Sequence, residues 1–200
     1  MKLLLFSDLH SDSKMASHII EKSEDVDIVI GAGDFCTIHR GLQDIIYQLR
    51  AITKPIVLVP GNSETLDELR LACKNWENAE ILHGAGTEIN NLHFYGIGGG
   101  IPVTPFGSWS YDFSEEEAEE LLLDCPAKSI LVSHSPPKGI LDSSSWKKSL
   151  GSTTIRNFID EKNPRLVVCG HIHESAGRQE CVRETLVVNA GPKGVIVELT

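Results

Sequence analysis

The sequence predicts an α/β fold, α+β in some classification schemes, in which two β-sheets pack as a sandwich with helices outside. Short apolar runs alternate with amphipathic stretches through the first half of the chain, which is typical of βαβ units and a largely parallel sheet. Most of these runs lack strict apolar–polar alternation, as expected of strands buried on both faces. Near the end of the chain, strand-like segments follow one another closely.

The predicted strands are short runs rich in leucine or β-branched residues. In chain order they are Lys2–Ser7, Asp27–Gly31, Ile56–Val59, Leu92–Ile97, Ser129–Ser133, Leu166–Cys169, Arg178–Val182, Thr185–Asn189 and Gly194–Leu199. The last three are separated only by Arg183-Glu184 and by a turn at residues 191–194. Connections this short favour antiparallel hairpins.

The predicted helices fill the intervals between strands. They are Lys14–Glu24, Gly41–Ala51, Glu64–Trp76, Ser114–Asp124 and Ser152–Asp160. In the third, Leu66, Leu69 and Cys73 lie on one stripe with charged residues opposite, which is typical of an amphipathic helix. In the fourth, Ser114 followed by three glutamates indicates a capping box.

Length and composition favour one globular domain over residues 1–200, with 41% hydrophobic and 23% charged residues. The net charge of −10 argues against binding to duplex nucleic acid, which depends on cationic contacts to phosphate. Five cysteines without a CxxC pair, and the absence of a secretory signal or membrane-length apolar run, predict a reduced, cytoplasmic protein without a membrane partner.

Side chains able to bind metal follow five of the predicted strands. They stand in the segments Ser7–His10, Gly31–Asp34, Pro60–Glu64, Leu131–Pro137 and Val168–His173. Functional sites in open α/β sheets collect outside such strand ends, and the adjoining glycines permit sharp backbone turns. The candidate ligands are Asp8, His10, Asp34, Asn62, His134, His171 and His173. So many ligands exceed the set of one tetrahedral zinc ion and suit a pair of ions bridged by a carboxylate.

Each motif alone also has an ordinary structural explanation. Asp8 is typical of a turn after a strand, Asp34 of a helix N-cap, and Gly61-Asn62 of a tight turn. The alternating His171 and His173 in a glycine-bounded turn are harder to explain by packing. The five motifs in this order therefore favour a metal centre over a set of unrelated turns.

In this order the motifs resemble those of the calcineurin-like metallophosphoesterase superfamily: Asp-x-His, Gly-Asp, Gly-Asn-His-Asp/Glu, a single His after a strand, and Gly-His-x-His. Residues 133–142 and 169–174 look most like the Icc-related branch of predicted phosphoesterases. The resemblance implies a four-layer αββα architecture. It also implies that one metal ion is held by Asp8, His10, Asp34 and His173, and the other by Asp34, Asn62, His134 and His171.

One position departs from the family pattern. Where the superfamily commonly has histidine, this chain has Ser63, and a serine hydroxyl has no useful acidity near neutral pH. By the resemblance, the missing imidazole protonates the leaving group or binds the phosphate. General-acid help of this kind is typically worth about 10²–10⁴-fold, so substrates with good leaving groups would suffer least. His39, beside Arg40, is a candidate substitute, although a solvated helix start is its more ordinary interpretation.

Some further residues have structural interpretations. Cys36 is a candidate nucleophile only if a base activates it, and Cys169 lies in an apolar run typical of the core. The longest predicted loop is the aromatic loop, residues 98–111, which contains Phe106, Trp109 and Tyr111. Long loops of this kind are lids or interfaces more often than idle connections. For Trp109 and Trp146, burial at an interface is the favoured role.

We therefore expect a metal-dependent phosphoric ester hydrolase, a phosphodiesterase that uses a metal-bridging hydroxide on small phosphodiesters or nucleotide-like esters. Asp34 and Asn62 are the expected catalytic residues. Mixed nitrogen and oxygen donors suit two divalent ions, Mn²⁺, Fe, Zn²⁺ or Ni²⁺. The alternatives are a weakly catalytic or non-catalytic metal-binding scaffold for a protein partner, and a hydrolase of non-phosphate esters. The sequence leaves open whether the protein forms a homo-oligomer.

Overall fold

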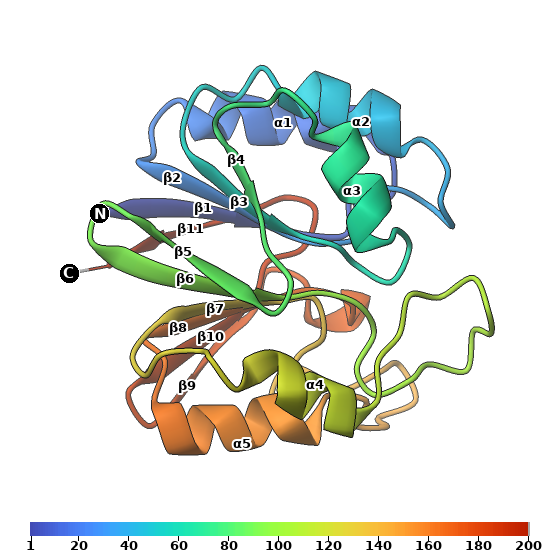
Figure 1. The fold of residues 1–200 in the computed structure, drawn as a ribbon, viewed down its shortest axis with the longest axis vertical. Helices are drawn as coiled ribbons and strands as arrows, with labels where there is room; N and C mark the ends of the chain where they lie inside the picture. The colour runs from blue at the N-terminus through green and yellow to red at the C-terminus, as the bar shows by residue number, and fades with distance from the viewer. Residues whose placement is uncertain (200) are drawn as a thin grey trace.

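Two β-sheets lie face to face, with helices on both outer faces, in the computed structural model of residues 1–199 (Figure 1). Thr200, the last residue of the predicted domain, lies outside the described residues. The predicted sandwich of two sheets flanked by helices is therefore confirmed.

The first sheet contains the strands near the N-terminus and the last strand of the chain. Its strands are β1 (Lys2–Phe6), β2 (Ile28–Ala32), β3 (Ile56–Val59), β4 (Ala79–Ile81) and β11 (Val195–Glu198). The order across the sheet is β11-β1-β2-β3-β4, with β11 antiparallel to β1 and the other pairs parallel. Its outer face is covered by α1 (Ser13–Ser23), α2 (Leu42–Leu49) and α3 (Leu66–Ala72) (Figure 1).

The second sheet has its parallel strands at the centre and antiparallel strands at both edges. Its strands are β5 (Ala85–Ile89), β6 (Leu92–Ile97), β7 (Ile130–Ser133), β8 (Leu166–Cys169), β9 (Gln179–Val182) and β10 (Thr185–Asn189). The order is β5-β6-β7-β8-β10-β9. Its outer face is covered by α4 (Glu115–Leu122) and α5 (Thr153–Lys162), and a short 3₁₀ helix, η1 (His173–Ser175), follows β8.

The core has three layers, which explains why the strands lack a polar face. Leu3 and Leu5 of β1 point between the two sheets, whereas Leu4 and Phe6 of the same strand point toward α1, α2 and α3. A third cluster, with Leu131 of β7, fills the space between the second sheet and α4 and α5. Successive side chains of a central strand are thus buried on opposite faces, as the continuous apolar runs predict.

The last predicted hairpin is wrong. β9 and β10 do form an antiparallel hairpin, but β11 leaves the second sheet and pairs with β1, placing Val195 opposite Leu5. The crossing is built by Gly191 and Gly194, which have φ of 63° and 67°, a region that favours glycine. Ser7 fixes it further, since its backbone N–H donates to the Gly191 carbonyl at 3.1 Å and its hydroxyl accepts from Gly191 N at 2.9 Å.

Other differences concern element boundaries. β4 and β5 were not predicted, because these half-exposed strands contain glutamate, glycine and alanine, which are depleted in strands. α3 is shorter than the predicted 64–76, since Thr65 forms a capping box with Glu68 and Cys73 ends the helix. The capping box predicted at Ser114 is confirmed, and Glu117 is its partner.

Candidate metal centre

The predicted ligands come from both sheets and meet at one end of the sandwich. They follow the strands β1, β2, β3, β7 and β8, which are central strands of the two sheets. By strand, they are Asp8 and His10 after β1, Asp34 after β2, Asn62 after β3, His134 after β7, and His171 and His173 after β8. Packing of the two sheets therefore brings residues 163 positions apart, such as Asp8 and His171, into hydrogen-bond contact.

Four donor atoms converge in one group, the inner cluster, formed by Asp34, Asn62, His134 and His171. Oδ1 of Asn62 lies 3.1 Å from Nε2 of His134 and 3.0 Å from Nδ1 of His171. The two ring nitrogens are 3.2 Å apart, and Oδ1 of Asp34 is 3.4 Å from Nε2 of His134. Atoms bound to one ion at about 2.1 Å are separated by about 3 Å, so these donors fit a divalent ion.

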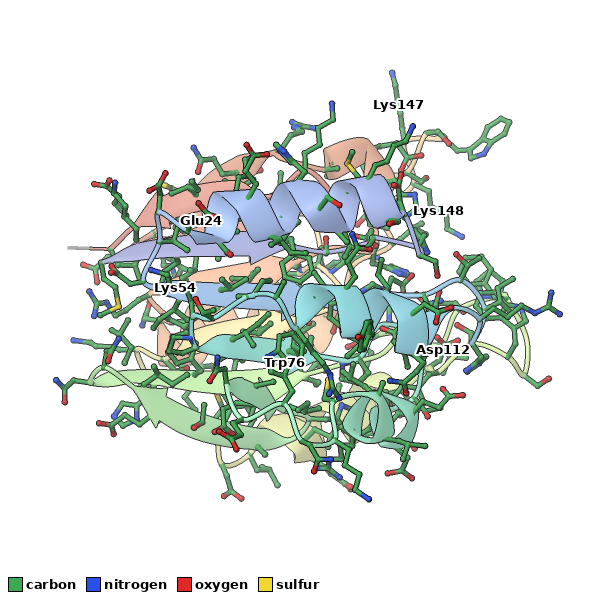
Figure 2. The ribbon with its side chains drawn as sticks, turned by 90° about the horizontal axis from the view of Figure 1, so that it is seen from above. Glu24, Lys54, Trp76, Asp112, Lys147 and Lys148 are labelled. Atoms are coloured by element: carbon green, nitrogen blue, oxygen red, sulfur yellow. The ribbon has the colours of Figure 1, made fainter. Side chains whose placement is uncertain are left out.

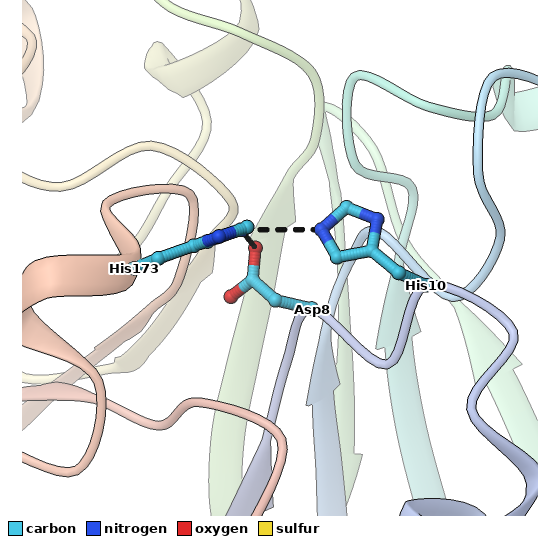
Figure 3. A group of neighbouring side chains, drawn as sticks. All are labelled: Asp8, His10 and His173. Carbon is cyan, nitrogen blue, oxygen red and sulfur yellow. Dashed lines mark hydrogen bonds and ion pairs between the residues drawn. The ribbon is translucent and has the colours of Figure 1, made fainter.

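A second group, the outer cluster, is formed by Asp8, His10, His173 and the other oxygen of Asp34. The Nε2 atoms of His10 and His173 are 3.1 Å apart, and Nε2 of His173 is 3.5 Å from Oδ1 of Asp8 (Figure 3). Nε2 of His10 lies 3.7 Å from Oδ2 of Asp34. The two oxygens of Asp34 thus face different clusters, which is the arrangement of a bridging carboxylate.

Backbone carbonyls orient two of the imidazoles. Nδ1 of His134 donates to the Ala32 carbonyl at 2.8 Å, and Nδ1 of His10 donates to the Cys36 carbonyl at 3.1 Å. In the neutral ring this leaves the Nε2 lone pair directed into the cluster, the usual arrangement of a metal-binding histidine. Lone pairs of His134 and Asn62 then face each other at 3.1 Å, and such contacts need a cation or a proton between them.

The charges of the site shift the pKa values of its members in opposite directions. Burial and the positive charge of His134 lower the pKa of His171 to about 4. Burial opposes protonation of His134 too, but the carboxylates of Asp34 and Asp8 outweigh it and raise the pKa of His134. For Asp8, the hydrogen bond from His173 and the charge of His134 outweigh burial and lower the pKa to about 2. Asp8 therefore remains charged at neutral pH and attracts cations.

The backbone at the ligands adopts a conformation that few residue types favour. Asp8, Asp34 and His171 have φ of 55°, 54° and 65°, and His10 shares this left-handed region. Strained residues of this kind cluster at functional sites, where the surrounding structure holds them in place. Gly61 packs against one of them so closely that an added Cβ would lie 2.0 Å from Oδ1 of Asp34. Sequence motifs identify the glycine, but they do not show this contact.

Ser63, at the position of the missing imidazole, faces inward. Its side chain is buried, and its hydroxyl donates to Oδ2 of Asp34 at 3.1 Å. Next to it, Glu64 is buried and accepts the backbone N–H groups of Gly61, Phe35 and Cys36. Burial and the negative charge of Asp34 raise the pKa of Glu64 to about 7. Glu64 thus ties together the two turns that contain Asp34 and Asn62, a role that the sequence analysis missed.

His39 is neither a solvated helix start nor directed into the clusters. Its Nδ1 contacts Oε2 of Glu68 at 2.8 Å, and its Nε2 donates to the Trp109 carbonyl at 2.6 Å. Both ring nitrogens are therefore occupied by links between α3 and the aromatic loop. Cys36 is buried, and burial together with the charge of Glu64 raises its pKa, so the thiol is not activated as a nucleophile.

The aromatic loop contacts the inner cluster at Asn62. Tyr111 N donates to the backbone carbonyl of Asn62 at 3.0 Å, and the rings of Phe106 and Trp109 stack with centroids 5.5 Å apart. The second tryptophan, Trp146, is 90% exposed in a turn that is joined to η1 by a hydrogen bond from Ser145 N to Glu174. Burial of Trp146 at an interface with another molecule stays a prediction. Among residues 1–199, none of the helices combines the length and apolar composition needed to cross a membrane.

Comparison with known proteins places this geometry in a family. The chain is 32% identical over 210 residues to the uncharacterized protein MJ1162 of Methanocaldococcus jannaschii, covering 98% of this chain and 91% of that protein. The structure of TT1561 of Thermus thermophilus has the same fold, with a TM-score of 0.78, 20% identity, and coverage of 96% of this chain and 90% of that one.

A dimetal phosphatase from Danio rerio is a more distant structural relative. It superposes with a TM-score of 0.61 at 11% identity, over 94% of this chain and 86% of that one. The family model of the calcineurin-like phosphoesterase superfamily domain matches residues 1–196. The four-layer architecture, the order of the motifs and this match agree, and the chain belongs to the calcineurin-like phosphoesterase superfamily.

Proposed function

We propose that the protein hydrolyses small phosphodiesters or nucleotide-like phosphate esters with the help of two divalent metal ions. The observation that supports this most directly is the position of Asp34, whose two oxygens face two separate groups of nitrogen and oxygen donors. A dimetal phosphatase shares the fold, in agreement with the proposal. Asp8, His10, Asp34 and His173 would hold one ion, and Asp34, Asn62, His134 and His171 the other.

The donor set restricts the metal only in part. Imidazole, carboxylate and amide donors without thiolate suit Mn²⁺, Fe, Zn²⁺ or Ni²⁺, and availability decides among them. When bound, such a pair of ions supplies a nucleophile from water at neutral pH and neutralises charge on the phosphoryl oxygens. The protein's contribution is to hold the seven side chains in place, through the carbonyls of Ala32 and Cys36 and the contacts of Ser63 and Glu64 with the turns.

The environment of Ser63 favours substrates with good leaving groups. Because the Ser63 hydroxyl donates its proton to Asp34 and is buried, it is not available to protonate a leaving oxygen. The other candidate for the general acid is His39, but both of its ring nitrogens contact protein atoms, in Glu68 and Trp109. Without a general acid at these positions, turnover depends on leaving groups that depart as stable anions.

The test is hydrolysis of bis-p-nitrophenyl phosphate beside p-nitrophenyl phosphate. Protein stripped of metal is reconstituted separately with Mn²⁺, Zn²⁺, Ni²⁺ and Mg²⁺, with Asp34→Asn as the control variant. We expect metal-dependent turnover that favours the diester and is abolished in Asp34→Asn. Binding of two metal ions without turnover of either ester would contradict the catalytic proposal and favour a metal-binding scaffold. Turnover of carboxylate esters but not phosphate esters would identify the non-phosphate hydrolase instead.

A further inference from the structure

The side-chain amide of Asn62 presents different atoms to its two sides. Oδ1 faces the ring nitrogens of His134 and His171, at 3.1 and 3.0 Å. Nδ2 faces away from them and donates to Oγ of Ser110 at 3.1 Å. An amide nitrogen cannot serve as a neutral metal ligand, so a 180° rotation of this group would replace a metal-binding oxygen with two N–H donors. The orientation of the amide therefore decides whether the inner cluster can hold a cation.

A chain of hydrogen bonds behind Asn62 fixes this orientation. Oγ of Ser110 lies 2.7 Å from Oδ1 of Asp112, and the other oxygen of Asp112 accepts the backbone N–H and the hydroxyl of Thr104 at 2.9 and 2.6 Å. A carboxylate offers only acceptors, so the single hydroxyl proton of Ser110 is directed to Asp112. The Thr104 hydroxyl also lies 3.1 Å from Oγ of Ser110, but its closer acceptor is Asp112 at 2.6 Å. A lone pair of Ser110 is therefore left for Asn62, and only the NH₂ side of the amide can use it.

We propose that Ser110 and Asp112 are positioning residues that hold Oδ1 of Asn62 toward the inner cluster and thereby build the metal-binding site of that cluster. The proposal rests on the proposed function, because it concerns the metal site assigned there. Tyr111, between the two residues, donates its backbone N–H to the carbonyl of Asn62 at 3.0 Å, so the same short segment fixes both the backbone and the side chain of Asn62.

The position of Asp112 in the fold agrees with this role. It lies at the end of the molecule where the loops follow the strands, together with Lys148, whereas Glu24 and Lys54 lie at the other end (Figure 2). Asp112 is 50 residues from Asn62 in sequence and follows the aromatic loop directly.

The two residues predict different consequences of substitution. Ser110→Ala removes the acceptor of the Asn62 N–H groups, and Ser110→Thr retains it. In Asp112→Asn the amide oxygen must face the backbone N–H of Thr104, because that N–H is a fixed donor. The new NH₂ group then donates to Ser110. The hydroxyl proton of Ser110 is therefore free to point toward Asn62, and the amide of Asn62 is no longer held in one orientation. A residue that only supported the loop would tolerate this replacement, since asparagine has the same shape and makes the same number of hydrogen bonds.

The experiment measures metal binding rather than turnover. Isothermal titration with Mn²⁺ and metal content after desalting are compared for the wild-type chain, Ser110→Ala, Ser110→Thr and Asp112→Asn. The matched controls are Ser108→Ala, an exposed serine of the same loop, and Asp124→Asn, an exposed aspartate after α4. Unfolding of each metal-free variant by urea shows that the variants are folded.

We expect Ser110→Ala and Asp112→Asn to bind one of two ions about 10- to 100-fold more weakly, which is the usual effect of removing a partner behind a metal ligand. Ser110→Thr and both controls should bind two ions like the wild type. The loss in Asp112→Asn should persist in about 1 M salt, where the Debye length is about 3 Å, because it reflects orientation rather than long-range charge.

The outcomes separate this proposal from the proposed function. Two ions bound with unchanged affinity in Ser110→Ala and Asp112→Asn would overturn the positioning role while leaving the metal-dependent hydrolase intact. Loss in Asp112→Asn that disappears at high salt would also overturn it, since charge alone would then explain the effect. A wild-type chain that binds no second ion would overturn both proposals, and hydrolysis of the phosphodiester by that same preparation would show independently whether activity remains.

Discussion

Ser63 holds both oxygens of the Asp34 carboxylate. Its backbone N–H donates to Oδ1 at 2.8 Å and its hydroxyl donates to Oδ2 at 3.1 Å. The orientation of the Asp34 carboxylate is therefore fixed, with one oxygen directed toward each cluster. The family pattern predicts a general acid at this position, and serine cannot serve as one. In the structure, this serine instead orients the carboxylate that faces both clusters.

Ser63→Ala should weaken the metal-free protein. It removes a hydroxyl donor from a carboxylate that is only 4% exposed. A hydrogen bond to a charged group contributes about 1.5–3 kcal/mol, so we expect the free energy of unfolding in urea to fall by this amount. Ser108→Ala, an exposed serine, is the control and should change it little. The ratio of turnover between activated and unactivated esters should stay the same, and a steeper dependence on the leaving group would show that Ser63 does donate a proton.

The link between His39 and Trp109 should depend on pH. Burial alone would lower the pKa of His39, but the hydrogen bonds to Glu68 and the Trp109 carbonyl raise it above 6.5. A raised folded-state pKa means that the stabilisation is complete below the unfolded value of 6.5 and is lost as pH rises through the folded value. The difference in unfolding free energy between wild type and His39→Gln should therefore be largest below pH 6.5 and shrink as the pH rises above this value. A difference independent of pH would contradict the protonated link.

For catalysis, His39→Ala should have little effect. Because both ring nitrogens are used inside the protein, turnover of an activated ester should stay within about tenfold of the wild type, less than the usual contribution of a general acid. A larger fall in turnover, in protein with its full metal content, would identify His39 as a proton donor.

Gly61→Ala should prevent assembly of the metal centre. The added Cβ would lie 2.0 Å from Oδ1 and 2.1 Å from the backbone nitrogen of Asp34, so the two turns must separate. Overpacking of this kind typically costs about 1–3 kcal/mol of stability. Metal content after reconstitution is the measurement, and we expect it to fall for both ions. Gly107→Ala is the control, because nothing lies within 4 Å of its added Cβ. Its φ of 86° favours glycine, so this variant should lose some stability but retain both ions.

Thiol labelling should find one reactive cysteine. Cys181 is exposed, and the other four cysteines are buried, with burial raising the pKa of Cys73 to about 12 and that of Cys125 to about 11. Native protein should react rapidly with one equivalent of a disulfide reagent, and Cys181→Ser with none. Rapid reaction of Cys36 in that variant would contradict this prediction and support Cys36 as a thiolate nucleophile.

The central strands were predictable from the sequence because each is buried on both faces. β3, β6, β8 and β10 have the predicted bounds, since their apolar runs end where the chain leaves the core. β4 and β5 escaped prediction because half-exposed edge strands need no apolar run. The crossing of β11 escaped prediction for another reason. Turn length at Gly191 predicts a hairpin, whereas contacts between residues far apart in sequence, such as that of Gly191 with Ser7, direct the chain to the first sheet.

The residues of the site that stand in short motifs were predictable from the sequence, and the others were not. Short motifs after strands identify Asp8 and His173 as candidates, because strand ends at one edge of a fold bring such residues together. Ser110 and Asp112 stand in no motif, and their relation to Asn62 depends on a loop path that no periodicity encodes. Positive φ at Asp34 is equally invisible, because the strain is imposed by the packing around it rather than by its own residue type.

The pairing of β11 with β1 sets an order for events during synthesis. Strand β1 keeps one edge unpaired until Val195–Glu198 has been made, although Asp8 and His10 follow this strand closely. His134, His171 and His173 also emerge late. A nascent chain that ends after Asn62 thus exposes four of the seven proposed ligands together with the unpaired edge of β1. The ligands after β7 and β8 are added next, and β11 covers the edge last. The full donor set proposed for the two metal ions can therefore form only after His173 has been made.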